Sequence, residues 1–236
     1  MNEALFARYP ALPAWTALFA RLPENPCLSL TGMADGEKPF FAAALAHTSK
    51  RPVLLVSPTE LTAKRQAQDI GRLGIPAAVL PSRDVQFSRA ASSRESTWQR
   101  LQVLHDAVHG RIRVLCVSAE AALDRCPNVQ AFQSAVIPLR EGGRIAPNLL
   151  IGQLLHLGYE RVAMVEGRGQ CAMRGAIVDI YPPTESDALR LEFFDDEIDS
   201  IRRFDCVSQR SIERVRDALI TPASECILGD PEAAAK

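Results

Sequence analysis

The first half of the chain alternates between short apolar runs and longer stretches of mixed polarity. Residues 52–57 (PVLLVS) are a continuous apolar run, which is typical of a parallel strand buried on both faces. Residues 59–73 instead repeat their apolar side chains at the spacing of an amphipathic helix. Similar patterns predict further strands at 27–31, 77–81 and 114–117, and further helices at 14–22, 39–47, 92–108 and 119–125. The alternation predicts an α/β domain with a parallel sheet, which we place at residues 1–130.

From residue 131 onward the pattern changes to closely spaced strands. A strand is expected at 132–139, followed by a helix at 147–157 that begins at Pro147 and is ended by Gly158. Four strands in two hairpins are expected next, at 159–166, 171–181, 188–194 and 198–204. This pattern predicts a smaller α+β domain of antiparallel hairpins at residues 131–220.

The last part of the chain is less regular. Residues 211–219 fit either a strand or a helix. Residues 221–236 are expected to be a linker, in which residues 229–236 (GDPEAAAK) begin a further helix.

The strand at 188–194 places a large aromatic side chain among charges. Side chains alternate between the two faces of a strand, so if the leucines face the core, Arg190, Glu192 and Phe194 share the opposite face. Arginine and aromatic side chains are frequent anchors of protein interfaces. Two interpretations of Phe194 remain open: it contacts a partner, or another element of this chain covers it.

Two stretches of this region carry a resemblance to a known family. Residues 174–182 read RGAIVDIYP, and residues 190–202 read RLEFFDDEIDSIR. Together they resemble the UvrB-homology module, which occurs in the excision-repair protein UvrB and at the N-terminus of the bacterial transcription-repair coupling factors. Residues 205–211 (DCVSQRS) and 222–225 (PASE) are more similar to the coupling factors. A weaker resemblance extends back to about Leu28.

The resemblance implies a non-catalytic interaction module that recruits the repair protein UvrA to a stalled RNA polymerase. It implies that Arg174, Arg190 and Phe194 contact UvrA. For Arg174 an internal ion pair with a neighbouring carboxylate is the alternative, because residues 171–181 show no clean alternation. Full coupling factors also bind RNA polymerase and double-stranded DNA through further domains, including ATP-driven motors. This chain ends before those domains and therefore resembles an N-terminal fragment.

A glycine-bearing loop at residues 32–39 (GMADGEKP) has the layout of a phosphate-binding P-loop. Gly32 and Lys38 fit the pattern G-x-x-x-x-G-K-[ST], but Glu37 follows Gly36 where the second glycine belongs, and Pro39 replaces the hydroxyl residue. Glutamate places negative charge beside an anion, and proline supplies neither a hydroxyl for magnesium nor an N–H for a phosphate. These five residues are therefore expected to form a degenerate, non-functional nucleotide loop, as the resemblance also implies.

Composition and charge narrow the function further. The 236 residues are 47% hydrophobic and 23% charged, which is typical of a globular protein with a substantial core. The net charge of -1 provides no general attraction to nucleic acid or to an anionic membrane. No apolar run is long enough to span a membrane, and no signal peptide is visible. We expect a cytoplasmic protein.

The sequence contains no pattern of a metal or cofactor site. The six cysteines, at positions 27, 116, 126, 171, 206 and 226, include no C-x-x-C pair, so free thiols in a reducing cytoplasm are expected. His105 and His109 have i, i+4 spacing but are expected to be a solvated helix end. The acidic residues 195–199 lack the spacing of a calcium loop and are expected to be a solvated turn. We expect no cofactor and no catalytic residue.

Two other function classes stay open. One is an NTPase or helicase domain with a divergent P-loop, which Glu37 and Pro39 disfavour. The other is a DNA-binding module, which needs a basic face. Residues 190–217 instead carry six arginines against eight aspartates and glutamates.

Overall fold

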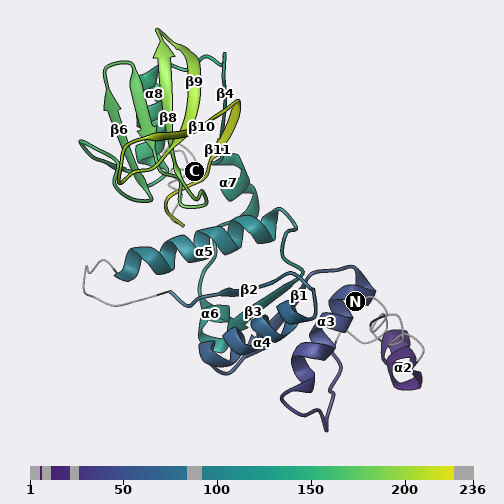
Figure 1. Ribbon diagram of the computed structural model, residues 1–236. Coiled ribbons are helices and arrows are strands. Elements are labelled where there is room, and N and C mark those ends of the chain that lie inside the picture. The colour runs from purple at the N-terminus through teal and green to yellow at the C-terminus, as the bar shows by residue number, and fades with distance from the viewer. Residues whose placement is uncertain (1–5, 7–11, 22–26, 84–91, 226–236) are drawn as a thin grey trace, which may run out of the picture. The chain divides into compact units, whose positions relative to one another are not determined.

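The computed structural model describes residue 6 and residues 12–21, 27–83 and 92–225, which belong to two compact units (Figure 1). The first unit comprises Met1–Val85 and Val103–Asp124, and the second comprises Gln86–Gln102 and Arg125–Lys236. Helix α5 (Ser92–Val108) therefore contributes residues to both units. The prediction that residues 229–236 begin a helix falls outside the described residues.

The first unit is built on three parallel strands in the order β1-β3-β2. Their bounds are β1 Val53–Ser57, β2 Ala77–Leu80 and β3 Val114–Ser118. Helices α3 (Glu37–Ser49) and α4 (Glu60–Arg72) pack on one face through a core that includes Ala43, Ala63 and Ile70. Helices α2 (Pro13–Arg21) and α6 (Ala119–Leu123) complete the described elements. The predicted α/β arrangement with a parallel sheet is confirmed.

Two expectations for this unit are wrong. Residues 27–31 form no strand, since the sheet contains only β1, β2 and β3 in the described part of the unit. The apolar run at β1 is a strand, but it is not buried on both faces, because Leu54 and Val56 are more than half exposed. β1 lies at the edge of the sheet, and these two side chains alternate with the ones that pack beneath α3 and α4.

The second unit contains a six-stranded sheet in the order β10-β9-β8-β7-β6-β5. Its strands are β5 Glu160–Arg161, β6 Gln170–Arg174, β7 Ile177–Ile180, β8 Ala188–Phe194, β9 Glu197–Phe204 and β10 Ser211–Val215. Neighbouring strands are antiparallel except for β5, which pairs parallel to β6. A separate antiparallel pair joins β4 (Ile137–Arg140) to β11 (Asp217–Ile220). The expected succession of a parallel unit and a mostly antiparallel one is therefore observed.

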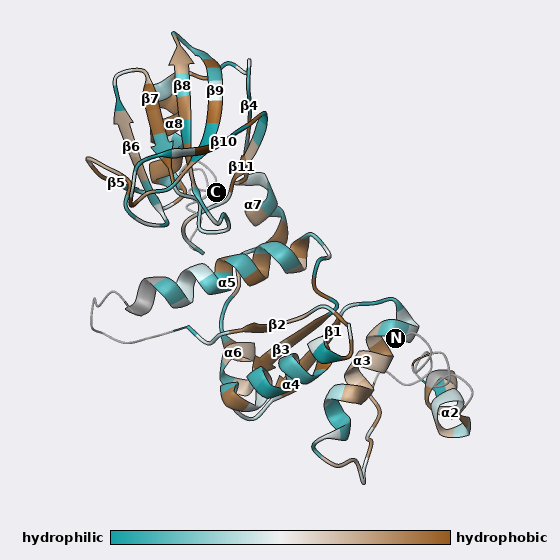
Figure 2. Cartoon of the chain, in the orientation of Figure 1, coloured by the Kyte–Doolittle hydropathy of each residue, from teal (hydrophilic) through white to brown (hydrophobic). Residues whose placement is uncertain are grey.

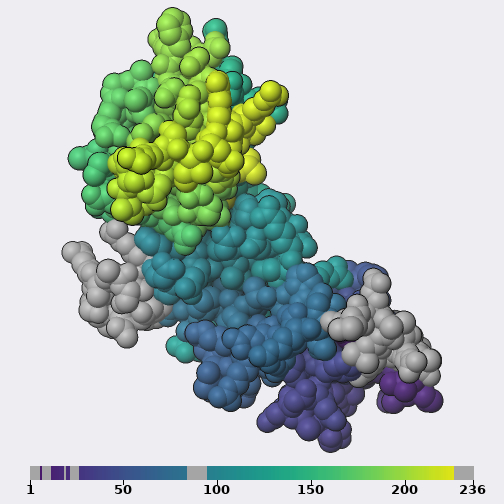
Figure 3. All heavy atoms as spheres, in the orientation of Figure 1, coloured from purple at the N-terminus to yellow at the C-terminus, as the bar shows by residue number. Residues whose placement is uncertain are grey.

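Helix α8 (Pro147–His156) closes the main core of the second unit. Leu150, Ile151 and Leu154 pack against Val178 of β7 and Leu191 of β8. In Figure 2 this helix and the central strands carry hydrophobic segments, whereas the segment after β9 mixes hydrophilic stretches with the hydrophobic β11. Figure 3 shows that C-terminal segment, in yellow, lying across the green strands on the surface of the unit.

The hairpins differ from the predicted ones. Residues 171–181, predicted as one strand, form the hairpin β6–β7, which turns at Gly175 with φ +60°. Residues 159–166, predicted as a full strand, provide only the two residues of β5. The predicted hairpin placed its turn between residues 166 and 171, where Gly169 also has a positive φ of +73°, but the antiparallel reversal lies at Gly175.

Two further segments also differ from expectation. Residues 132–139, predicted as a strand, are divided between helix α7 (Val129–Ser134) and β4. The side chain of Asn128 caps α7 by accepting hydrogen bonds from the N–H groups of Gln130 and Ala131, at 2.9 and 3.3 Å. Residues 211–219, for which strand and helix were both open, are the strands β10 and β11.

Candidate partner-binding surface

The two faces of β8 differ as the sequence pattern predicts. Leu189, Leu191 and Phe193 are buried in the core beneath α8. Their alternating neighbours lie on the opposite side of the sheet. We call this side the open face and define it by Arg174, Asp179, Arg190, Glu192 and Phe194. It brings together the three residues for which a partner contact was expected.

The strand register determines which of these residues are neighbours. Asp179 of β7 lies directly opposite Arg190 of β8, and Ile177 lies opposite Glu192. Directly opposite residues of an antiparallel pair bring their side chains within contact distance on the same face. One end of the open face is covered by a small second core of Val165, Ala172, Ala188 and Phe204.

Phe194 is a highly exposed aromatic residue of the open face. Its exposed fraction is 81%, so no described part of the chain covers it. It ends β8 immediately before the two-residue turn Asp195-Asp196, in which Asp195 adopts a φ of +57°. The alternative that Phe194 is a core residue does not hold for the described residues.

Arg190 lies on the same face but is largely covered, with only 16% of its side chain exposed. Its Nε donates to Asp179 Oδ1 at 2.7 Å, and its Nη2 donates to Asp179 Oδ2 at 2.9 Å and to Gln209 Oε1 at 3.0 Å. The guanidinium lies 4.4 Å from the centroid of the Phe204 ring. The hydrogen bonds that Arg190 donates to Asp179 raise the pKa of its guanidinium above the ordinary value, against the opposing effect of burial.

Arg174 reaches the same carboxylate from β6. Its Nη2 donates to Asp179 Oδ2 at 2.8 Å, and 47% of its side chain remains exposed. The internal ion pair that stood as the alternative for Arg174 is therefore present. It uses one nitrogen of the guanidinium and leaves almost half of the side chain accessible to a partner.

Asp179 is the residue of this surface that the sequence analysis missed. It is a single acid between the buried apolar residues Val178 and Ile180, and only 1% of its side chain is exposed. A charged residue in the middle of an apolar strand is costly to bury unless it is paired. That signal was present in the sequence, but the predicted single strand at 171–181 concealed which arginines it would meet.

The charged side chains of the glycine-bearing loop pair with groups of the same loop. Lys38 Nζ lies 2.6 Å from Asp35 Oδ1, and the Ala34 N–H donates to Glu37 Oε2 at 2.9 Å. Gly32 has a φ of +83°, whereas Gly36 has an ordinary right-handed φ of -69°. Helix α3 begins at Glu37, so Pro39 lies in its first turn and is buried. The lysine and the N–H that a phosphate would use already have carboxylate partners.

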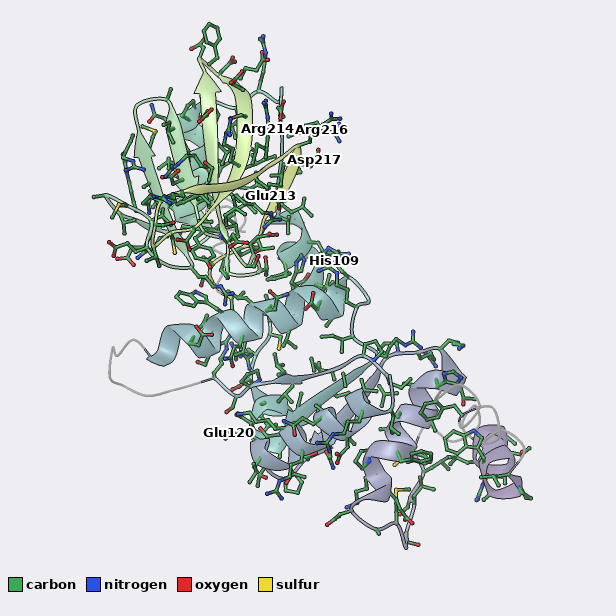
Figure 4. All side chains as sticks on the ribbon, viewed as in Figure 1. His109, Glu120, Glu213, Arg214, Arg216 and Asp217 are labelled. Atoms are coloured by element: carbon green, nitrogen blue, oxygen red, sulfur yellow. The ribbon has the colours of Figure 1, made fainter. Side chains whose placement is uncertain are left out.

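A charged groove with a volume of about 610 Å³ lies elsewhere in the second unit. Its walls carry the ion pairs Arg140–Asp217, at 2.7 Å, and Arg214–Glu141, at 2.8 Å. Figure 4 shows Arg214, Arg216 and Asp217 gathered along the β10–β11 segment. Three arginines and four carboxylates line the groove, so their charges nearly cancel and give it little preference for a charged ligand.

The histidines and cysteines of the described residues offer no second site. His105 is buried with its ring centroid 4.2 Å from that of His109, so the expected solvated helix end describes only the exposed His109. Burial raises the pKa of the Cys116 and Cys171 thiols to about 11, which makes them poor nucleophiles. Among the described residues, no three His, Cys, Asp or Glu side chains are grouped to hold a metal ion. No described helix is long and apolar enough to cross a membrane.

Comparison with known proteins shows which proteins this chain is related to. Residues 137–226 match the model of the UvrB interaction domain. The chain is 33% identical over 208 residues to the transcription-repair-coupling factor of Bacillus subtilis (strain 168), covering 87% of this chain and 18% of that protein. It is 31% identical over 200 residues to the transcription-repair-coupling factor of Escherichia coli (strain K12), covering 83% of this chain and 17% of that protein.

A second class of relatives aligns over a similar stretch. The UvrABC system protein B of Fervidobacterium nodosum is 25% identical over 214 residues, covering 84% of this chain and 32% of that protein. The chain thus spans less than a fifth of the coupling factors and about a third of the UvrB protein that it matches. It is homologous to the transcription-repair-coupling factors and to UvrB, and it carries a UvrB interaction domain.

Proposed function

We propose that this chain is a non-catalytic interaction module that recruits UvrA to a stalled RNA polymerase, and that it binds UvrA through the open face. The names of the two classes of relatives support this proposal. One class is named for coupling transcription to repair and the other for the UvrABC repair system, and this chain is similar to a region of both. A region shared by two otherwise different proteins fits a partner that both contact, and the resemblance of residues 174–182 and 190–202 to the UvrB-homology module implies that this partner is UvrA.

The observation that carries the proposal is the 81% exposure of Phe194, on the same face of the sheet as Arg174 and Arg190. An exposed aromatic ring has no role in the core of its own unit, and such rings often supply much of the binding energy when they enter a partner's apolar pocket. The guanidinium of Arg174 can donate two parallel hydrogen bonds to a carboxylate of the partner. Phe194 and Arg190 are four residues apart on one strand, about 13 Å at about 3.3 Å per residue.

The degenerate nucleotide loop supports a role without catalysis. Gly32, Gly36, Glu37, Lys38 and Pro39 lack the second glycine and the hydroxyl of a P-loop, and the lysine is paired with Asp35. We propose that the first unit is a helicase-type domain that has lost its nucleotide site. In this proposal ATP-driven translocation, RNA polymerase binding and binding to double-stranded DNA belong to other parts of the full-length cytoplasmic protein.

Direct binding to purified UvrA, without DNA or ATP, tests this function. Calorimetric titration is expected to show a complex with the unaltered chain. Phe194→Ala should weaken it by about 2 kcal/mol or more, which is about thirtyfold in Kd. Leu149→Ala is the matched control, because Leu149 is an exposed apolar residue on α8, which covers the other face of the sheet.

The control variant should bind UvrA with an affinity within twofold of the unaltered chain. The melting temperature should not change in either variant, since neither side chain is packed in a core. Absence of any complex with the unaltered chain would refute the proposed function. An equal loss in both variants would refute the assignment of the open face.

A further inference from the structure

We propose that Asp179 is a positioning residue for partner binding, which holds Arg174 and Arg190 in place from beneath the open face. This inference rests on the proposed function, since it concerns how the same face is prepared for its partner. Asp179 cannot itself touch a partner, because only 1% of its side chain is exposed. Any effect that it has on binding must therefore act through the residues that it holds.

The carboxylate of Asp179 is the centre of the polar network on this face. Both of its oxygens accept hydrogen bonds from Arg190, at 2.7 and 2.9 Å, and Oδ2 also accepts one from Arg174 at 2.8 Å. The three residues come from the adjacent strands β6, β7 and β8, so the network joins three strands of the sheet. Hydrogen bonds between ionised groups are stronger than neutral ones, and the burial of Asp179 reduces their screening by water.

The two arginines are held to different degrees. Besides its bonds to Asp179, Arg190 donates a hydrogen bond to Gln209 and lies over the ring of Phe204. Gln209 is itself anchored, because its Nε2 donates to the carbonyl of Cys206 at 2.8 Å and to that of Val165 at 3.2 Å. Arg174 makes a single side-chain hydrogen bond in the described part of the chain, and that bond goes to Asp179. Its orientation therefore depends on this one carboxylate.

The network also leaves charge for a partner. One carboxylate is shared by two guanidinium groups, so the trio carries a net charge of about +1 by the ordinary charges of these side chains. An exposed arginine normally loses conformational entropy when a partner immobilises it, at a cost of about 0.5–1.5 kcal/mol. Because Asp179 already holds Arg174 in the free protein, part of this entropy is lost on folding rather than on binding. The part of the face around Arg174 is therefore prepared for an acidic group of the partner.

Asp179→Asn tests this role, because asparagine keeps the size of the side chain and removes its charge. UvrA affinity, measured by calorimetry and corrected to the folded fraction from circular dichroism, should fall at least tenfold. Glu185→Gln is the matched control: Glu185 is a partly buried carboxylate of the same unit that pairs with Arg203 at 2.6 Å. This control should retain UvrA affinity within twofold of the unaltered chain.

A double-mutant cycle separates positioning from a general loss of stability. If Asp179 acts through Arg174, adding Arg174→Ala to Asp179→Asn should weaken binding less than threefold further, although Arg174→Ala alone weakens it at least tenfold. Adding Phe194→Ala to Asp179→Asn should instead multiply the two separate losses, because the ring does not contact the network. Full multiplication with Arg174→Ala, or a folded Asp179→Asn that binds within twofold of the unaltered chain, would overturn the inference.

A second pair of variants decides the matter if Asp179→Asn does not fold. Arg190→Met with Asp179→Leu replaces the buried ion pair by apolar side chains of similar size, a change that proteins often tolerate. It should bind UvrA at least threefold more weakly than Arg190→Met alone, because Arg174 has lost its anchor; equal binding overturns the inference. The failures are distinguishable. A wrong function leaves the unaltered chain without a UvrA complex, whereas a wrong inference leaves a complex that Phe194→Ala weakens and the loss of Asp179 does not.

Discussion

Arg190 and Phe194 occupy the same side of one strand but differ in what surrounds them. Arg190 lies in the middle of β8, flanked by Asp179 of β7 and Arg202 of β9 and covered by Phe204. Phe194 lies at the end of the strand, where the chain turns and no described element covers it. Because of its position in the strand, Arg190 also stabilises the unit, whereas the exposed ring of Phe194 contributes little to its packing.

This difference predicts different costs for two truncations on the open face. Arg190→Ala should reduce the free energy of unfolding by about 2 kcal/mol or more, because it removes two hydrogen bonds from a buried carboxylate. Phe194→Ala should change it by about 0.5 kcal/mol or less, as is usual for exposed positions. Leu191→Ala, on the covered face, should cost about 2–5 kcal/mol.

Urea denaturation of the three variants, followed by circular dichroism, measures these costs. The order Leu191, Arg190, Phe194 is expected, from the largest loss to the smallest. A Phe194→Ala variant that melts as early as Leu191→Ala would mean that the ring is packed after all. Because Arg190 contributes to folding, its effect on UvrA binding must be read per folded molecule.

At the scale of elements, the end of α8 is tied to the segment that follows β11. Gly158 ends the helix with a φ of +88°, in the left-handed region that favours glycine. The Ala223 N–H donates to the Leu157 carbonyl at 2.9 Å, and the Tyr159 hydroxyl donates to the Thr221 carbonyl at 2.7 Å. The C-terminal segment therefore helps to close the core of the second unit, in which Ile220 is buried.

Two glycines of this region should respond oppositely to alanine. At Gly158 a Cβ would lie 2.6 Å from the Cβ of Ser224, and the positive φ adds strain of about 1–2 kcal/mol. Gly152 lies inside α8, where such a Cβ would meet nothing within 4 Å beyond the backbone of its own helix. Gly158→Ala should therefore lower the melting temperature, whereas Gly152→Ala should leave it unchanged or raise it, since alanine is favoured over glycine in a helix by up to about 1 kcal/mol. Thermal unfolding of both variants checks this, and a neutral Gly158→Ala would contradict the assigned helix end.

At the scale of the whole molecule, charge is balanced rather than concentrated. The net charge is -1, and residues 190–217 contain six arginines against eight acidic residues. Several of these arginines are paired within the second unit, among them Arg203 with Glu185 and Arg214 with Glu141. Binding to the DNA backbone depends on cations that are available to phosphates. These paired arginines are therefore less available to the phosphates of duplex DNA.

We expect weak, salt-sensitive binding of this chain to double-stranded DNA. Gel shifts at physiological salt should show little complex, and any complex formed at low salt should disappear as salt is added. UvrA binding is the positive control for the same preparation. A complex that resists salt would favour the DNA-binding alternative over the interaction module.

The sequence by itself determined the features that depend on local pattern. The alternation of apolar runs and amphipathic stretches predicted the parallel unit, because strand and helix periods are properties of neighbouring residues. The period of two along β8 assigned Leu191 to the core and Phe194 to the opposite face, and both assignments are confirmed. The stretches at 174–182 and 190–202 led to the family, which the comparisons confirm.

Only the tertiary structure decided which side chains meet across strands. The positive φ of Gly175 divides residues 171–181 into β6 and β7, and that division places Asp179 opposite Arg190. Residues 132–139 became a helix and a strand because Asn128 caps α7 and β11 pairs with β4. Burial of a charge depends on partners that are distant in sequence, so alternation placed Arg190 on the correct face but gave no sign that Asp179 holds it there.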